Sequence, residues 1–83
     1  MSQTEETKDL IKIEKWVKKR AGVPAIVKDT KDLLRIKFDS LDSSLDEITW
    51  AKFFKIFKDN KLIFIYESDE ASRFCKFING EEV

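Results

Sequence analysis

Six lysine and arginine residues of this sequence are candidates for a site that binds phosphate groups. Lysine and arginine hold phosphate groups through charge and hydrogen bonds. The segment from Lys12 to Lys37 carries nine cations against three acids, although the whole chain balances 16 cations against 16 acids. We therefore expect a local basic patch that binds nucleic acid or another polyanion. Its expected members are Arg20, Lys28, Arg35, Lys37, Arg73 and Lys76.

A second interpretation of the same cations is a solvated, amphipathic sheet face, because long charged side chains cover apolar surface in many proteins. The balanced net charge of zero argues against a dedicated polyanion binder. The sequence also has no RNA-binding motif of the Lys-Gly-Phe type. Both interpretations stay open at this point.

The usual residues of catalysis and metal binding are missing. The chain has no histidine, so it has no ordinary general base near neutral pH. Cys75 is the single cysteine, which excludes an internal disulfide and a Cys/His metal cluster. Neighbouring cations would activate its thiol, but a small apolar role on a strand is the favoured interpretation. We predict no catalytic residue, no cofactor and no metal.

One aromatic stripe organises the predicted fold. Trp50, Phe53, Phe54 and Phe57 follow the i, i+3, i+4, i+7 spacing, which predicts one face of a helix that packs in the core. Ile56 lies off this stripe and is expected to be partly exposed. The predicted N-cap is Thr49, with a capping box at Ser44 as the alternative, and Asn60 is expected to end the helix in the left-handed conformation.

The remaining elements complete an α+β domain. A first helix is expected to begin near Thr4 or Thr7 and to end at Ala21, with Gly22 as its left-handed cap. Strands are expected at residues 25–28, 33–38 and 62–66, whereas residues 72–78 fit either a strand or a helical turn. We predict two helices on one small, mainly antiparallel sheet, in the order α-β-β-α-β-β. We expect residues 1–83 to form a single domain with flexible tails at 1–6 and 80–83.

Four segments in this order resemble the motifs of a family of small uncharacterised bacterial proteins. The motifs are R-x-G-x-P-A-x-V-K at residues 20–28, L-R-I-x-F at 34–38, I-[ST]-W-x-x-F-F-x-x-F at 48–57 and S-x-F-x-K at 72–76. Some members of that family carry the label 1,4-alpha-glucan branching enzyme. Such glycosyl transfer needs two carboxylates flanking a sugar, in a barrel of about 250 residues. We therefore expect no branching activity from this chain.

A surplus of apolar residues suggests a second function, as a protein-interaction or self-associating domain. Two short helices cannot cover all of these side chains, and exposed apolar patches usually mark interfaces. The residues concerned are Trp16, Ile26, Ile56, Ile63, Ile65 and Tyr66.

The sequence also predicts a cytoplasmic protein with no membrane partner. Its N-terminus is polar and acidic, unlike a secretory signal. Its longest apolar run, residues 62–66, is far too short to cross a membrane. A lone thiol fits a reducing compartment.

Overall fold

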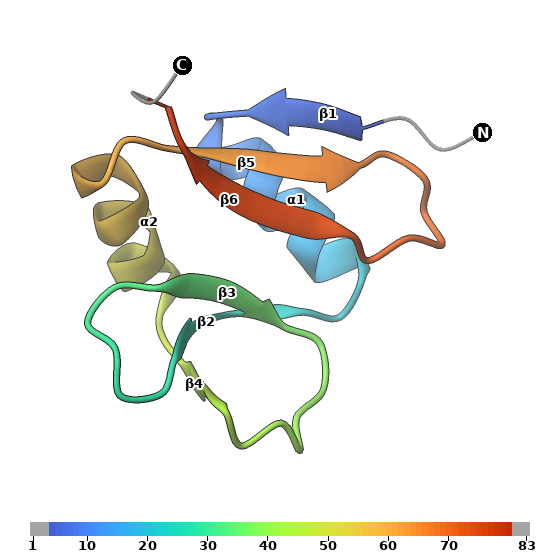
Figure 1. The fold of residues 1–83 in the computed structure, drawn as a ribbon. Coiled ribbons are helices and arrows are strands. Elements are labelled where there is room, and N and C mark those ends of the chain that lie inside the picture. Colours follow the sequence, from blue (N-terminus) through green and yellow to red (C-terminus); the bar gives the residue numbers. More distant parts are fainter. Residues whose placement is uncertain (1–3, 81–83) are drawn as a thin grey trace.

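The computed structural model describes residues 4–80, which form two helices and two antiparallel three-stranded sheets (Figure 1). Sheet A has the strand order β1-β5-β6, and sheet B has the order β3-β2-β4. The elements are β1 (Thr4–Thr7), α1 (Leu10–Lys19), β2 (Val23–Val27), β3 (Leu34–Lys37), β4 (Leu45–Glu47), α2 (Trp50–Asp59), β5 (Leu62–Glu67) and β6 (Cys75–Asn79).

This architecture confirms the α+β class and the predicted order of elements, with β1 and β4 as additional strands. The prediction of a single sheet was wrong, because the two hairpins do not pair with each other. Each pairs instead with its own third strand: β4 joins β2, and β1 joins β5. Residues 72–78, which had two possible structures, supply most of strand β6.

The N-terminal end of the chain is more ordered than predicted. Residues 4–6, which were expected in a tail, lie in β1 and pair with β5. Helix α1 therefore begins later, after Asp9, whose Oδ1 accepts hydrogen bonds from the backbone N–H groups of Ile11 at 3.0 Å and Lys12 at 3.3 Å. At the other end, the N–H of Gly80 donates to the carbonyl of Lys61 at 2.8 Å, and residues 81–83 lie outside the described part of the chain.

Helix α2 begins where the sequence predicts, but its buried face is rotated. Thr49 caps the helix and accepts a hydrogen bond from the N–H of Lys52 at 3.1 Å. Phe53 and Phe57 are buried as expected. Ile56 is buried too, whereas Trp50 and Phe54 at the edges of the stripe are only half-buried. The aromatic stripe is therefore a core-facing side of the helix whose edge is partly exposed to solvent.

Each helix is followed by a non-glycine residue in the left-handed conformation, which ends the helix. Ala21 has φ 57° and Lys61 has φ 51°, so the caps lie one residue away from the predicted Gly22 and Asn60. Gly22 is required for a different reason. A Cβ built there would lie 2.9 Å from Ile36 Cγ2 and from Phe38 Cε1, so the chain passes too close to sheet B for any side chain.

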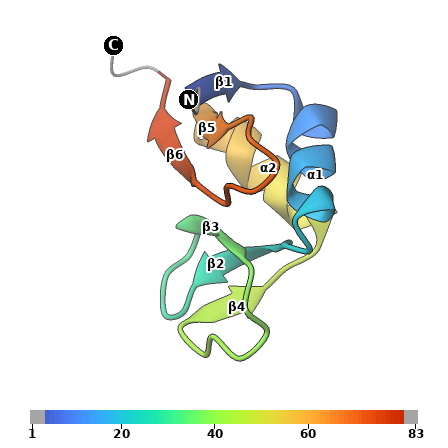
Figure 2. The ribbon, with the colours of Figure 1, turned by 90° about the vertical axis from the view of Figure 1, so that its right-hand side faces the viewer.

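One core holds the two sheets and the two helices together. Both helices lie on the same side of sheet A, and sheet B packs below it (Figures 1 and 2). Trp16 of α1 is central, since its ring lies 5.4 Å from that of Phe64 on β5 and 6.2 Å from that of Phe38 just after β3. The buried apolar side chains are Ile13, Trp16, Val17, Ala25, Leu34, Ile36, Phe53, Ile56, Phe57, Phe64 and Tyr66.

Candidate anion-binding cleft

The six predicted patch residues separate into three groups in the structure. Arg35, Arg73 and Lys76 come together at one hollow. Lys28 and Lys37 lie elsewhere on sheet B. The sixth, Arg20, is part of the interior.

Arg20 is only 8 % exposed and has a structural role. Its Nε donates to the carbonyl of Ser72 at 2.6 Å, its Nη2 to that of Asp69 at 2.7 Å and its Nη1 to that of Trp16 at 3.1 Å. The guanidinium also lies 4.1 Å from the centre of the Trp16 ring. The expectation that Arg20 belongs to an accessible patch was therefore wrong. No sequence signal distinguished this arginine, because its partners are carbonyl groups about fifty residues away.

Lys28 and Lys37 lie outside the hollow. Lys28 is exposed in the turn after β2, and its backbone N–H donates to the carbonyl of Ser44 at 2.9 Å. The Nζ of Lys37 lies 3.4 Å from the carbonyl of Leu45, and its side chain lines a separate hollow that also contains Glu47. A nearby carboxylate makes that second hollow less suited to an anion.

The remaining three cations line a cleft between the sheets, which we call the β3–β6 cleft. Its volume is about 330 Å³, within the range of small-ligand sites. None of the described residues that line it is acidic. The lining consists of Arg35, Ile36, Phe38, Arg73, Cys75, Lys76 and Phe77.

Strand geometry explains how the cations reach the cleft. β3 and β6 are edge strands of different sheets, and they lie side by side in Figure 1. Arg35 alternates with the buried Leu34 and Ile36, so it projects from β3 on the side away from the core. Its Nη1 donates to the carbonyl of Leu34 at 2.8 Å, which holds the guanidinium near the strand edge. Lys76 alternates with the half-buried Cys75 and Phe77 of β6, so it lies at the exposed rim of the cleft, on the face of sheet A that carries Ile65.

Arg73 is held by an aromatic contact. Its guanidinium lies 5.6 Å from the centre of the Phe38 ring, and the two residues come from opposite sides of the cleft. A cation over an aromatic face gains free energy, more so when it is shielded from water. The contact therefore places an exposed arginine at the cleft while it leaves the edge of the guanidinium available for a ligand.

Cys75 is a half-buried part of the cleft wall. Burial raises the pKa of its thiol to about 11, and the charges of Arg20 and Arg35 oppose this shift only partly. The thiol is accordingly protonated at neutral pH, which supports the small apolar role and contradicts the alternative of an activated nucleophile.

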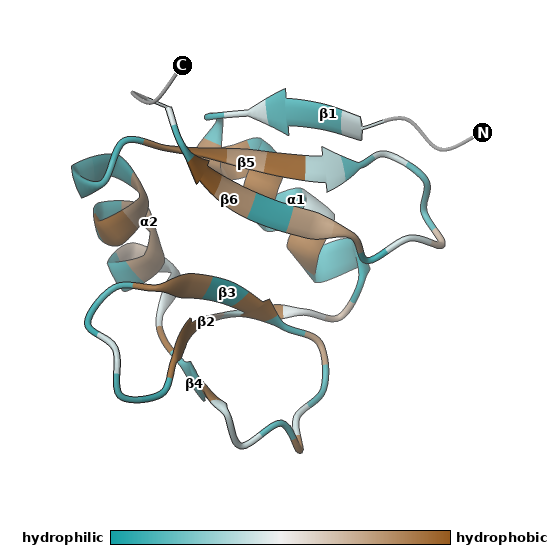
Figure 3. Ribbon diagram, in the orientation of Figure 1, coloured by the Kyte–Doolittle hydropathy of each residue, from teal (hydrophilic) through white to brown (hydrophobic). Residues whose placement is uncertain are grey.

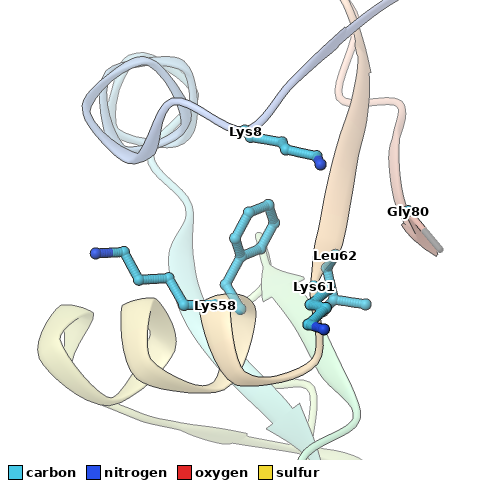
Figure 4. A pocket seen from close by; sticks show the side chains of 6 residues that line it. Lys8, Lys58, Lys61, Leu62 and Gly80 are labelled. Carbon is cyan, nitrogen blue, oxygen red and sulfur yellow. The ribbon is translucent and has the colours of Figure 1, made fainter.

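A second group of cations, which the sequence analysis missed, lines another hollow of about 390 Å³. Lys8, Lys58 and Lys61 surround it, together with Leu62 and other residues (Figure 4). In this view Lys8 reaches toward β5, whereas Lys58 extends in the opposite direction. In this view the ammonium groups of Lys8 and Lys58 point away from each other. Sequence spacing gave no signal for this hollow, because Lys8 and Lys58 come to line it only through the tertiary fold.

Other kinds of site find little support in the described residues. Between residues 4 and 80, no three acidic or cysteine side chains are grouped closely enough to hold a metal ion. Neither of the two helices in that range is long and apolar enough to cross a membrane. Comparison of the chain with protein-family models, with curated proteins and with solved structures finds no significant match.

Proposed function

We propose that this protein is a noncatalytic binding module whose β3–β6 cleft holds the phosphate groups of a polyanion, with single-stranded nucleic acid as the ligand. The observation that supports the proposal is that Arg35, Arg73 and Lys76 line one hollow whose described lining has no acidic residue. Lys76 comes from β6 of sheet A, Arg73 from the loop between β5 and β6, and Arg35 from β3 of sheet B.

The chemistry of the cleft suits phosphate. Arginine presents several N–H donors in a planar fork that matches phosphate oxygens, and lysine adds a mobile point charge. Phe38 and Phe77 also line the cleft, but their rings pack on Trp16 and on the core, and the Arg73 guanidinium lies over Phe38. The expected contacts to a single-stranded nucleic acid are therefore those of the cations with its phosphate backbone.

The absence of histidine from the sequence and the protonated thiol of Cys75 support a role without catalysis. A branching activity is not part of this proposal. We also propose a cytoplasmic location, which the single free thiol supports.

A titration of the protein with labelled single-stranded RNA tests this function. Three phosphate contacts on a single strand predict a slope of log K against log salt of about −2, so affinity should fall roughly sixteenfold between about 50 and 200 mM salt. Arg35→Gln and Arg73→Gln should each weaken binding and make the slope less steep by about 0.7. The matched control is Lys12→Gln, which removes one exposed lysine from α1.

Two results would contradict the proposal. One is binding without a salt slope in the parent protein. The other is equal binding by Arg35→Gln, Arg73→Gln and the Lys12→Gln control. Duplex RNA and inorganic polyphosphate are run in parallel. Preference for polyphosphate over RNA would show that the cleft recognises phosphate chains, without a contribution from bases.

A further inference from the structure

Sheet A has one face that no part of the described chain covers. Strand alternation directs Phe64 and Tyr66 of β5 into the core, so Ile63 and Ile65 face the opposite side. The helices lie only on the core side, and the other face of sheet A is open toward the viewer in Figure 1. Ile78 on β6 shares this open face and is 37 % exposed.

One row of the open face has an acidic side chain at one edge, an apolar one in the middle and a basic one at the other edge. The register aligns Glu6 of β1, Ile65 of β5 and Lys76 of β6 in one row across the three strands. Glu6 and Lys76 are both exposed, and Ile65 lies between them in a shallow hollow. Figure 3 shows the hydrophilic β1 beside the hydrophobic β5.

We propose that this face binds a second copy of the chain, related by a two-fold axis that runs parallel to β5. Such an axis exchanges the two edges of the face and keeps each row in place. Glu6 then lies opposite Lys76 of the second copy, Lys76 lies opposite Glu6 of that copy, and Ile65 packs against its own equivalent. The pattern is self-complementary because the opposite charges occupy the same row.

The geometry agrees with ordinary sheet packing. Two stacked sheets lie about 10 Å apart and cross at about 30°, so Ile63 and Ile65 of both copies interdigitate at the centre. Glu67, at the end of β5, is the one residue of the middle strand that opposes this arrangement, since it lies near its own equivalent. The crossing angle separates the strand ends there. Glu67→Gln should consequently strengthen the association.

Sedimentation equilibrium of the pure protein at low salt, from micromolar to millimolar concentration, tests the proposal. The parent should form a dimer at the upper concentrations. Glu6→Lys and Lys76→Glu should each dissociate about tenfold more readily, because each places two pairs of like charges at the interface. An equimolar mixture of the two variants should form a heterodimer again, because every pair across the axis is then of opposite sign.

The mixing experiment separates loss of the interface from loss of the fold. Both substitutions are at exposed positions, and far-ultraviolet circular dichroism verifies that each variant is folded. A parent that stays monomeric at millimolar concentration overturns the proposal. So do single variants that dimerise as well as the parent, or a mixture that associates no better than either variant alone.

Discussion

Replacement of Arg20 is the sharpest test of how the loop between β5 and β6 is held. Arg20→Met keeps most of the aliphatic side chain but removes all donors. The carbonyl groups of Ser72, Asp69 and Trp16 then lose the guanidinium donors, which lie between 2.6 and 3.1 Å away. The contact with the Trp16 ring loses its charge. Arg20→Lys keeps the charge but not the planar fork.

The expected loss follows from these contacts. Three hydrogen bonds contribute about 1 kcal/mol each after the competition with water, and the cation–aromatic contact contributes about 1 kcal/mol. The sum is about 4 kcal/mol. The total stability of a domain of 83 residues is on the order of 4–12 kcal/mol. Arg20→Met should therefore remove at least about a third of the free energy of unfolding, and Arg20→Lys should lose about half as much because one ammonium cannot serve three separate carbonyls.

Denaturant unfolding followed by circular dichroism measures the loss. Hydrogen exchange adds a local readout, since the N–H of Ser72 donates to the carbonyl of Asp69 within the loop and should lose protection first. Lys19→Met is the matched control. Lys19 is exposed at the end of the same helix, so its replacement should change stability by less than about 0.5 kcal/mol.

A result within about 0.5 kcal/mol of the parent for Arg20→Met would refute the reasoning. It would mean that the loop is held by other contacts and that the guanidinium is free to leave its site. Full recovery of stability by Arg20→Lys would refute the narrower point that the planar fork is required.

Three further predictions concern the core, the close passage at Gly22 and the half-buried thiol. Phe57→Ala should cost about 3–5 kcal/mol because the ring is buried, whereas Phe54→Ala should cost markedly less; equal losses in thermal or denaturant unfolding would contradict the rotated helix face. Gly22→Ala should cost about 1–3 kcal/mol through overpacking, while Ala21→Gly should be neutral or stabilising in the same unfolding assay because φ is positive there. The pKa of Cys75 is raised by burial from 9.0 to about 11, so its contribution is complete below pH 9 and is lost as pH rises through 11. Relative to Cys75→Ala, the parent should lose about 1.4 kcal/mol per pH unit in that window; parallel stability curves for the two proteins would exclude a buried thiol.

Local patterns were sufficient to predict much of the fold. The aromatic spacing and Thr49 located helix α2, strand alternation located β3, and a short apolar run located β5. These signals are local because a helix or strand faces the core with a fixed period. β1 and β4 were missed because short, polar edge strands have no such period, and they form only where a neighbour offers free backbone groups.

The candidate site was predicted in part, for a related reason. The cation-rich segment 12–37 pointed to Arg35, and Arg73 and Lys76 were added as further candidates; the structure places all three at one cleft. The sequence could not show that Arg20 is buried. Charge is a property of a residue and is visible in the sequence. Solvent exposure and the meeting of two sheet edges depend on contacts between residues far apart in the chain, so only the tertiary structure decided which cations share a cleft and which one holds the fold together.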